Sequence, residues 1–312
     1  MPHPHGMRHV VSLTAAAFIL VTSPCMSKTE DAVAAPDAPV FVRAKLLAET
    51  STLQRGKSSW LAVRLTMRPG WHTYWRNPGD AGMATQIKWT LPEGATAGPI
   101  VWPVPQRFVA RSIVGFGYPD EVALLTAVRI PATFPFDNIA IGATVSWLAC
   151  EKVCVPGSET LVVALPVGDS AATIDPRNAK MFAQARRRVP QRAPFKATFR
   201  MDAEAIRIQI PRGMLGGLAK PELTFYPFDS SIIDHAAAQS TVMRERQAEL
   251  TLRRSATADE RMKRMDGLLI VKNAGSQAAR ALDVSANVAA LSATPPSAPF
   301  KTRTLIQENS RR

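Results

Sequence analysis

Cysteine is scarce in this sequence, with three residues among 312, and histidine (five) and tyrosine (three) are nearly as rare. One of the three is Cys25, so Cys150 and Cys154 form the single close pair. Without a second Cys pair or a His pair, the composition argues against a closed zinc site. Zinc-finger, helix-turn-helix and RNA-binding signatures are also missing, so the net charge of +13 indicates a basic surface and not a nucleic-acid-binding protein. Such a surface implies no more than a weak attraction to anionic membrane headgroups.

Long apolar runs are missing beyond the N-terminus. Residues 10–21 read VVSLTAAAFILV, and a small-x-small site follows at 32–34. This run is short for a membrane span but fits the core of a secretory signal peptide, so we expect a signal over 1–34 and a periplasmic mature protein. An uncleaved anchor stays open as an alternative. Lipid attachment at Cys25 is disfavoured because Pro24 stands where a small residue is needed. Outside the cytoplasm the remaining cysteines can form a disulfide.

Proline (25) outnumbers glycine (17), a balance that favours loop-rich β structure over helix bundles. Several short segments alternate apolar and polar residues, and residues 59–67 do so with Leu61, Val63, Leu65 and Met67 on one face. We therefore predict an all-β fold. After the signal peptide, the expected order is a first β-domain over 35–168, a linker over 169–194 with a short helix that begins at Asp175 and Pro176, a second β-domain over 195–293, and a disordered tail over 294–312.

The segment around the cysteine pair reads SWLACEKVCVPG over 146–157. A disulfide needs Cα atoms about 4.4–6.8 Å apart, whereas four residues of one extended strand span about 13 Å. The strand that ends at Cys150 must therefore turn back, and a three-residue turn sets Cys150 opposite Cys154. Within that turn Lys152 favours a nearby thiolate and Glu151 opposes it, so the balance of local charge stays open.

Three interpretations of the pair remain open at this point. In the first, the pair is redox-active, because strained or exposed disulfides exchange readily. In the second, it is a structural disulfide in a non-catalytic periplasmic binding module. So small a loop stabilises by only about 2 kcal/mol, however, and a structural disulfide normally ties distant strands. In the third, the two thiolates handle copper, with His72 and a nearby methionine as further donors to a soft ion.

Longer motifs surround the pair. They are WHTYWRNPGDAG at 71–82, IKWTLP at 87–92, WP at 102–103, GFGY at 115–118, and WLAC with CVPG within 147–157. Together they resemble the N-terminal periplasmic region of the DsbD/ScsB thiol–disulfide interchange family over residues 38–168. A weaker resemblance extends to residues 225–229 and 232–237 in the second half.

The resemblance implies an immunoglobulin-like β-sandwich followed by a second, smaller sandwich-like domain. It implies that Cys150 and Cys154 shuttle between dithiol and disulfide without a cofactor or metal, and that Cys154 forms the mixed disulfide. The GFGY segment resembles an aromatic cap loop of the family, so Phe116 or Tyr118 is expected to cover the pair or to dock a partner. The implied partners are a membrane-embedded thiol reductase and periplasmic thioredoxin-like proteins. The chain would then be a protein-disulfide reductase component in processes such as cytochrome c biogenesis or copper tolerance.

The sequence also departs from that family, because it holds no C-x-x-C motif and no second apolar segment. We therefore expect a stand-alone version of the N-terminal region that cannot carry electrons across a membrane by itself. The simplest expectations for the other motif residues are structural. Tryptophans fill the core, His72 is a structural hydrogen-bonding group, and residues 77–80 form a turn that could shape a docking surface together with Arg76.

Overall fold

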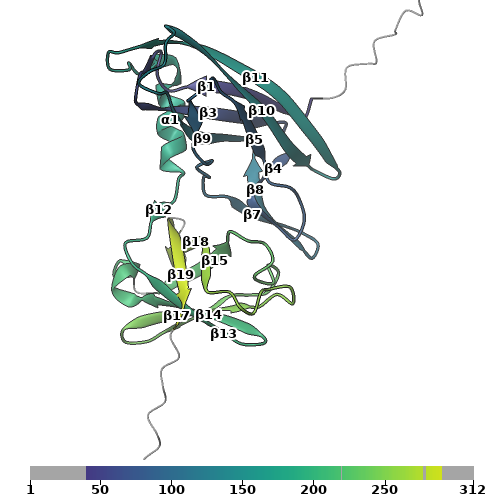
Figure 1. The fold of residues 1–312 in the computed structure, drawn as a ribbon. Coiled ribbons are helices and arrows are strands. Elements are labelled where there is room, and N and C mark those ends of the chain that lie inside the picture. The colour runs from purple at the N-terminus through teal and green to yellow at the C-terminus, as the bar shows by residue number, and fades with distance from the viewer. Residues whose placement is uncertain (1–39, 219, 277–278, 290–312) are drawn as a thin grey trace, which may run out of the picture. The chain divides into compact units, whose positions relative to one another are not determined.

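The computed structural model describes residues 40–218, 220–276 and 279–289, and these are built almost entirely of β-strands (Figure 1). The all-β prediction is therefore confirmed. The expected signal peptide over 1–34 and the expected tail over 294–312 lie outside the described residues. Within the described ranges, no helix is long and apolar enough to cross a membrane.

Two sheets in the first half share one buried apolar cluster. The first sheet has the order β1 (Val42–Ala48), β3 (Ser58–Met67), β9 (Glu121–Arg129) and β6 (Thr96–Ala97). The second has the order β2 (Leu53–Gln54), β11 (Cys154–Gly168), β10 (Asn138–Cys150), β4 (His72–Gly79), β8 (Ile113–Pro119) and β7 (Gln106–Ala110), while β5 (Gln86–Thr90) pairs with β10. Alternate residues of both sheets enter the cluster, which is the arrangement of an immunoglobulin-like sandwich.

Strand β3 and helix α1 (Pro176–Arg187) show how local sequence produces this packing. The four alternating apolar residues of β3 are all buried between the sheets, as the period-two pattern predicts. On the opposite face of the strand, Ala62 packs in a smaller cluster with Phe182 of α1. The helix begins as predicted, because the side chain of its N-cap residue Asp175 accepts a hydrogen bond from the N–H of Arg177 (2.9 Å).

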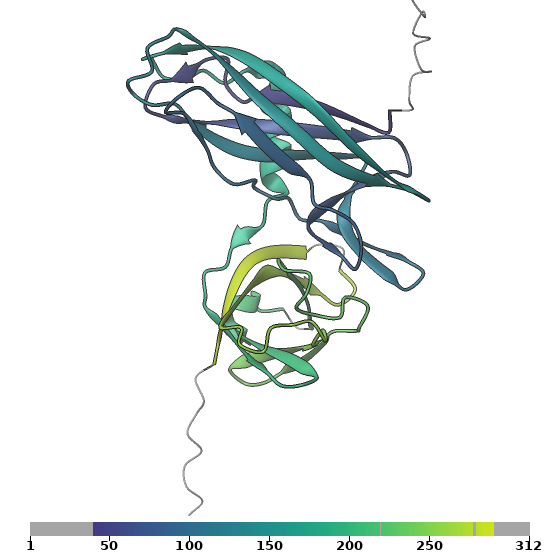
Figure 2. The ribbon, with the colours of Figure 1, turned by 45° about the vertical axis from the view of Figure 1, so that its right-hand side comes forward.

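The second half forms one eight-stranded sheet. Its order is β15 (Pro221–Pro227), β18 (Arg264–Asn273), β19 (Ala279–Val288), β13 (Ala197–Met201), β14 (Ala205–Pro211), β17 (Gln247–Arg253) and β16 (Ser240–Met243), with β12 (Gln191–Arg192) paired to β19 and a 3-10 turn, η1 (Arg212–Leu215), after β14. Figure 2 shows this sheet curving round on itself. Its interior is filled by an apolar cluster of its own. The second half is thus all-β as predicted, but a single curved sheet encloses its core.

One side chain joins the two ends of the curved sheet. The amide of Gln239, just before β16, accepts a hydrogen bond from the N–H of Phe225 in β15 (2.8 Å) and donates one to the carbonyl of the same residue (2.9 Å). The glutamine amide therefore takes the place of the peptide group of a neighbouring strand, and both backbone groups of a fully buried residue are satisfied.

Replacing this glutamine tests the closure of the curved sheet. Gln239→Ala should lower the free energy of unfolding by about 1–3 kcal/mol, because Phe225 loses the partner of two backbone groups. Urea denaturation followed by far-ultraviolet circular dichroism measures the effect, because all six tryptophans lie in the first half of the chain. The control is Gln184→Ala at an exposed position of α1, which should change stability by less than about 0.5 kcal/mol. Equal midpoints for the two variants would contradict the closure.

Candidate functional site

The two cysteines lie at the tip of the hairpin formed by β10 and β11. These strands pair from Asn138 opposite Pro166 to Cys150 opposite Cys154. The turn between them is closed by a hydrogen bond from the N–H of Glu151 to the carbonyl of Val153 (3.1 Å). The cysteines form a disulfide with a Cα–Cα distance of 4.1 Å. The predicted hairpin with a three-residue turn is therefore confirmed.

The two sulfurs differ in their access to solvent. Cys150 is 3% exposed, because β4 continues the sheet beside it and places His72 in register with it. Cys154 is exposed, and so is the neighbouring Val153 at 62%. In the described part of the chain, the outer edge of β11 pairs only at its far end, with β2. An incoming nucleophile can therefore reach the sulfur of Cys154, while Cys150 is shielded by its neighbouring strand.

The side chains beside Cys150 come from the outer face of the second sheet. Alternation places His72 and Tyr74 on one face, and the register places His72 directly opposite Cys150 on that same face. The hydroxyl of Tyr74 donates a hydrogen bond to Cys150 Sγ (3.1 Å). Burial raises the pKa of Tyr74, so the phenol keeps its proton and stays a donor.

Two glycines make room for the rings on this face. A Cβ atom at Gly82 would lie 2.4 Å from the ring of Tyr74, and one at Gly115 would lie 2.1 Å from the ring of Phe108. The centroid of the Phe108 ring lies 4.2 Å from that of His72 and 6.1 Å from that of Tyr74. His72, Tyr74 and Phe108 thus form an outer aromatic cluster beside the buried sulfur.

Comparison with known proteins agrees with this site. Residues 43–166 match the family described as "Thiol:disulfide interchange protein DsbD, N-terminal". This part of the chain is a DsbD N-terminal domain. With its cysteine pair joined in a disulfide, it is a thiol–disulfide exchange domain.

One of the solved structures that resemble the chain supports the fold. The crystal structure of the N-terminal periplasmic domain of ScsB from Proteus mirabilis matches with a TM-score of 0.56 and 17% identity, over 79% of this chain and 94% of that chain. At this identity the likeness shows the fold alone. A protein of unknown function from Porphyromonas gingivalis W83 matches with a TM-score of 0.22 and 10% identity, over 80% of this chain and all (100%) of that one. No curated protein matches in sequence.

The residues predicted as a cap lie on the inner face of this DsbD N-terminal domain. Phe116 and Tyr118 are each 1% exposed in the main cluster, and the hydroxyl of Tyr118 donates to the carbonyl of Pro103 (2.8 Å). Alternation along β8 explains the placement, because the outer positions are taken by Gly115, just before Phe116, and Gly117, between the two rings. A cap or docking role for the two rings stays a prediction, and it requires them to leave the core.

Sequence reasoning missed the outer aromatic cluster as a group. The alternation of His72 and Tyr74, together with Gly115 and Gly117 two residues apart, was the available signal for a face that seats rings. The expectation that His72 is a structural hydrogen-bonding group does not hold at Nε2. That atom is buried, and among the described residues it has no hydrogen-bond partner.

The charges of the turn largely offset each other. Lys152 Nζ lies 3.9 Å from Glu151 Oε1, and the backbone N–H of Lys152 donates to Glu151 Oε2 (3.0 Å). The lysine side chain is 88% exposed, and exposed ion pairs are worth about 0–1 kcal/mol. Within the described ranges, hydrogen bonding by Tyr74 is therefore the specific polar interaction with the cysteine pair.

The rest of the long motif contacts the curved sheet, which belongs to the same compact unit. The buried amide of Asn77 donates to the carbonyl of Pro227 (2.7 Å) and accepts from the N–H of Gly79 (2.8 Å). The guanidinium of Arg76 lies 4.1 Å from the centroid of the Phe228 ring. Phe228 of the chain itself thus covers one side of the Arg76 side chain, which is otherwise exposed, so a docking surface around Arg76 stays a prediction. Residues 77–79 end β4 in an irregular strand pairing rather than a simple turn.

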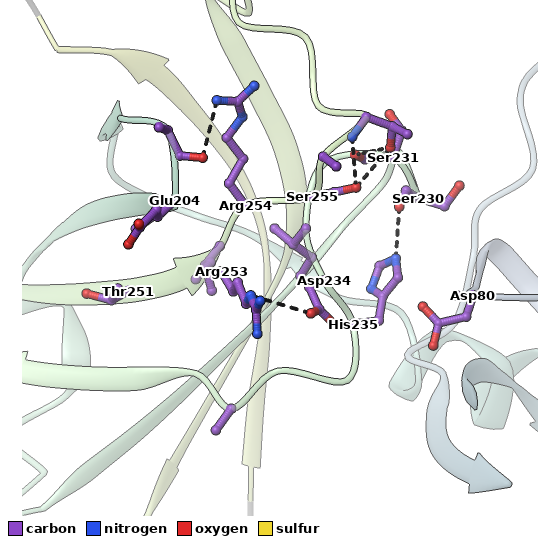
Figure 3. Close-up of a pocket in the computed structure, with 18 of the residues that line it drawn as sticks. Asp80, Glu204, Ser230, Ser231, Asp234, His235, Thr251, Arg253, Arg254 and Ser255 are labelled. Carbon is purple, nitrogen blue, oxygen red and sulfur yellow. Dashed lines mark hydrogen bonds and ion pairs between the residues drawn. The ribbon is translucent and has the colours of Figure 1, made fainter. Parts of the chain in front are cut away.

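A cavity of about 1110 Å³ lies elsewhere, mainly against the curved sheet (Figure 3). His235 contributes to its wall and shares a hydrogen bond with the carbonyl of Ser230 (3.0 Å), while Asp234 pairs with Arg253 (3.7 Å). None of the residues that line it is a cysteine. Across the described ranges, no group of three or more His, Cys, Asp or Glu side chains could hold a metal ion. The chemistry of the pair is therefore separate from this cavity.

The hydrogen bond to Cys150 makes a testable prediction. Tyr74→Phe should slow reduction of the disulfide by dithiothreitol about tenfold, because a hydrogen bond worth about 1.4 kcal/mol to the developing Cys150 thiolate is lost. Stopped-flow fluorescence or timed alkylation measures the rate.

The matched control for this change is Tyr118→Phe, which also removes a buried hydroxyl and its hydrogen bond, but on the inner face. Its reduction rate should equal that of the unchanged protein. Equal slowing in both variants would mean that loss of stability, and not the contact with sulfur, sets the rate.

Proposed function

We propose that the protein is a periplasmic thiol–disulfide interchange protein that relays electrons through Cys150 and Cys154. The observation that carries this proposal is the asymmetric disulfide, with one exposed sulfur and one buried sulfur that accepts a hydrogen bond from Tyr74. The partners we propose are a membrane-embedded thiol reductase as electron donor and oxidised, thioredoxin-like envelope proteins as acceptors. The expected signal segment supports the location, as does the description of the matched ScsB region as a periplasmic domain.

Reduction of the pair begins at the exposed sulfur. A thiolate of the donor attacks Cys154 Sγ, the Cys150–Cys154 bond breaks, and its electron pair passes to Cys150 Sγ. The hydroxyl of Tyr74 is already in place to stabilise that negative charge. A second thiolate of the donor then attacks the donor sulfur that is bound to Cys154, and Cys154 leaves as a thiolate. The donor leaves as a disulfide, and the protein is left with two thiols.

Delivery to a client runs through the same two sulfurs. The Cys154 thiolate attacks the disulfide of the client, and one client thiolate leaves. Cys150 then attacks Cys154 Sγ, which expels the second client thiolate and restores the intramolecular disulfide. No cofactor takes part in these steps. Cys154 is thus the residue that forms the mixed disulfide, and Cys150 is the residue that resolves it.

We further propose that the hairpin of β7 and β8 forms the cap over the pair. Phe108 lies on its outer face against His72, and Phe116 and Tyr118 anchor its inner face in the core. The tip of the hairpin exposes Ile113 at 49%. We therefore expect a partner to displace the ring of Phe108. Phe116 and Tyr118, which were first expected to cover the pair, instead hold the hairpin in the core.

The reduction potential is the measurement that tests the function first. A value of about −120 to −270 mV, the range of known exchange proteins, is expected for the purified protein equilibrated with glutathione or dithiothreitol. A potential below about −300 mV would identify a structural disulfide and overturn the relay.

Trapping in cells tests the roles of the two sulfurs. Cys150→Ser should accumulate mixed disulfides with envelope proteins, because the resolving thiol is missing. Cys154→Ser should accumulate none, because Cys150 is buried. Non-reducing electrophoresis of alkylated extracts measures both, with the double variant as the blank. Trapping by Cys154→Ser alone would reverse the assignment of the two residues.

A further inference from the structure

His72 has a nitrogen that the fold buries but does not use. Its Nε2 is inaccessible to solvent and has no hydrogen-bond partner among the described residues. Buried polar atoms normally have partners, so an unpaired one calls for an explanation. The histidine lies directly opposite Cys150 across the β4–β10 pair. The Cβ atoms of such opposed residues are about 4.5–5.5 Å apart.

The neighbours of His72 do not hold it in the charged form. Burial alone lowers its pKa, so the imidazole is neutral at neutral pH and has a free lone pair. The ionisable groups on the elements around it are Tyr74 of β4, Cys150 of β10, Cys154 of β11, Arg107 of β7, the Glu151–Lys152 pair of the turn, and Asp120 after β8. Of these, Arg107 donates to the carbonyl of His235, and Glu151 and Lys152 pair with each other.

We propose that His72 accepts the proton of the Cys150 thiol when Cys150 resolves a mixed disulfide. The inference rests on the proposed interchange function and adds to it a base for the buried cysteine. Cys150 needs such a group because it is 3% exposed and water has little access to its sulfur. Tyr74 cannot serve, since its buried phenol is itself a protonated donor to that sulfur.

The proton and the electrons are conserved in this step. The proton of Cys150 Sγ–H moves to His72 Nε2, and the freed electron pair attacks Cys154 Sγ. The bond between Cys154 and the client breaks, and its electron pair leaves on the client thiolate. The imidazolium of the half-buried His72 then releases a proton to solvent from its other nitrogen, Nδ1. In the reverse direction the imidazolium returns a proton to Cys150.

The resolving step can be watched with a chromophoric disulfide. Reduced protein mixed with dithiobis-nitrobenzoate should release one thiolate as Cys154 is modified, and a second as Cys150 displaces the label. The second phase is independent of reagent concentration and should disappear in Cys150→Ser. For the unchanged protein its rate should rise with pH through the lowered pKa of His72 and level off by about pH 7, because only neutral imidazole accepts a proton.

The test variant is His72→Phe, which keeps a ring against Phe108 but removes the base. Its second phase should slow on the order of 100-fold at neutral pH, and the rate should climb with hydroxide concentration without a plateau. The first phase at the exposed Cys154 should not change, and an unchanged midpoint of urea denaturation shows that the variant is folded. The matched control is His235→Phe, since that histidine also packs against an aromatic ring and also has one buried nitrogen without a partner among the described residues.

A second variant separates proton transfer from hydrogen bonding. His72→Gln keeps a polar group but no base, so it should be as slow as His72→Phe. A normal second phase in either variant, or equal slowing in His235→Phe, would overturn the proposal. These outcomes do not depend on cellular partners. If no envelope partner is trapped in cells, the relay fails while the effect of His72 in the purified protein still stands.

Discussion

Strands β4, β8, β10 and β11 pair in a fixed register, and the pleat makes successive side chains of each strand point to opposite faces of the sheet. This constraint sorts the aromatic residues of the site into two groups. Those on the inner face fill the core, whereas His72, Tyr74 and Phe108 lie on the outer face with Cys150. A shift of one residue in the register of β10 would exchange Cys150 with Ala149 and remove the sulfur from the tyrosine hydroxyl.

The position of each strand in the sheet makes the two sulfurs chemically unequal. Cys150 lies on a strand with a neighbour on each side, and Cys154 begins a strand that has no second neighbour beside it within the part of the chain that the structure describes. Exchange needs an attackable sulfur and a partner sulfur that leaves as a stabilised thiolate. In this hairpin the exposed Cys154 is the sulfur that can be attacked. Cys150 is the sulfur that leaves, and the buried hydrogen bond from Tyr74 stabilises its thiolate. Two cysteines only four residues apart in sequence thus differ in exposure and in hydrogen bonding once the sheet is assembled.

The curved sheet of the second half contributes to the same arrangement from the inner side. Tyr226 lies 4.5 Å from Phe116 between ring centroids, and Asn77 and Arg76 contact the segment that follows Tyr226. The hairpin of β7 and β8 therefore has the curved sheet against its inner face and the aromatic cluster against its outer face. This explains why the long motif that includes His72 continues through Arg76 and Asn77. The first residues of the motif lie beside the disulfide, and its last residues contact the second half of the chain.

Much of this protein follows from its sequence alone. Alternation over residues 59–67 predicted a half-buried strand, Asp175 and Pro176 predicted the start of the helix, and the spacing of Cys150 and Cys154 required a turn of three residues. These are local rules, because they depend on the pleat, the helix cap and the reach of a disulfide. The motifs around the pair likewise identified the kind of domain before any contact was known.

The tertiary structure decided which side chains meet. No local rule links Phe108 to His72, or Tyr74 to Cys150 across 76 residues, because strand pairing and register between distant segments set those contacts. For the same reason the resemblance alone led us to expect Phe116 or Tyr118 over the disulfide, whereas the pleat directs both rings into the core of this structure. Composition and spacing determined that the chain is mainly β and carries one close cysteine pair in a turn, and the resemblance of the surrounding motifs indicated thiol–disulfide exchange. The packing of sheets determined which sulfur is open, which is buried, and which groups lie beside the buried one.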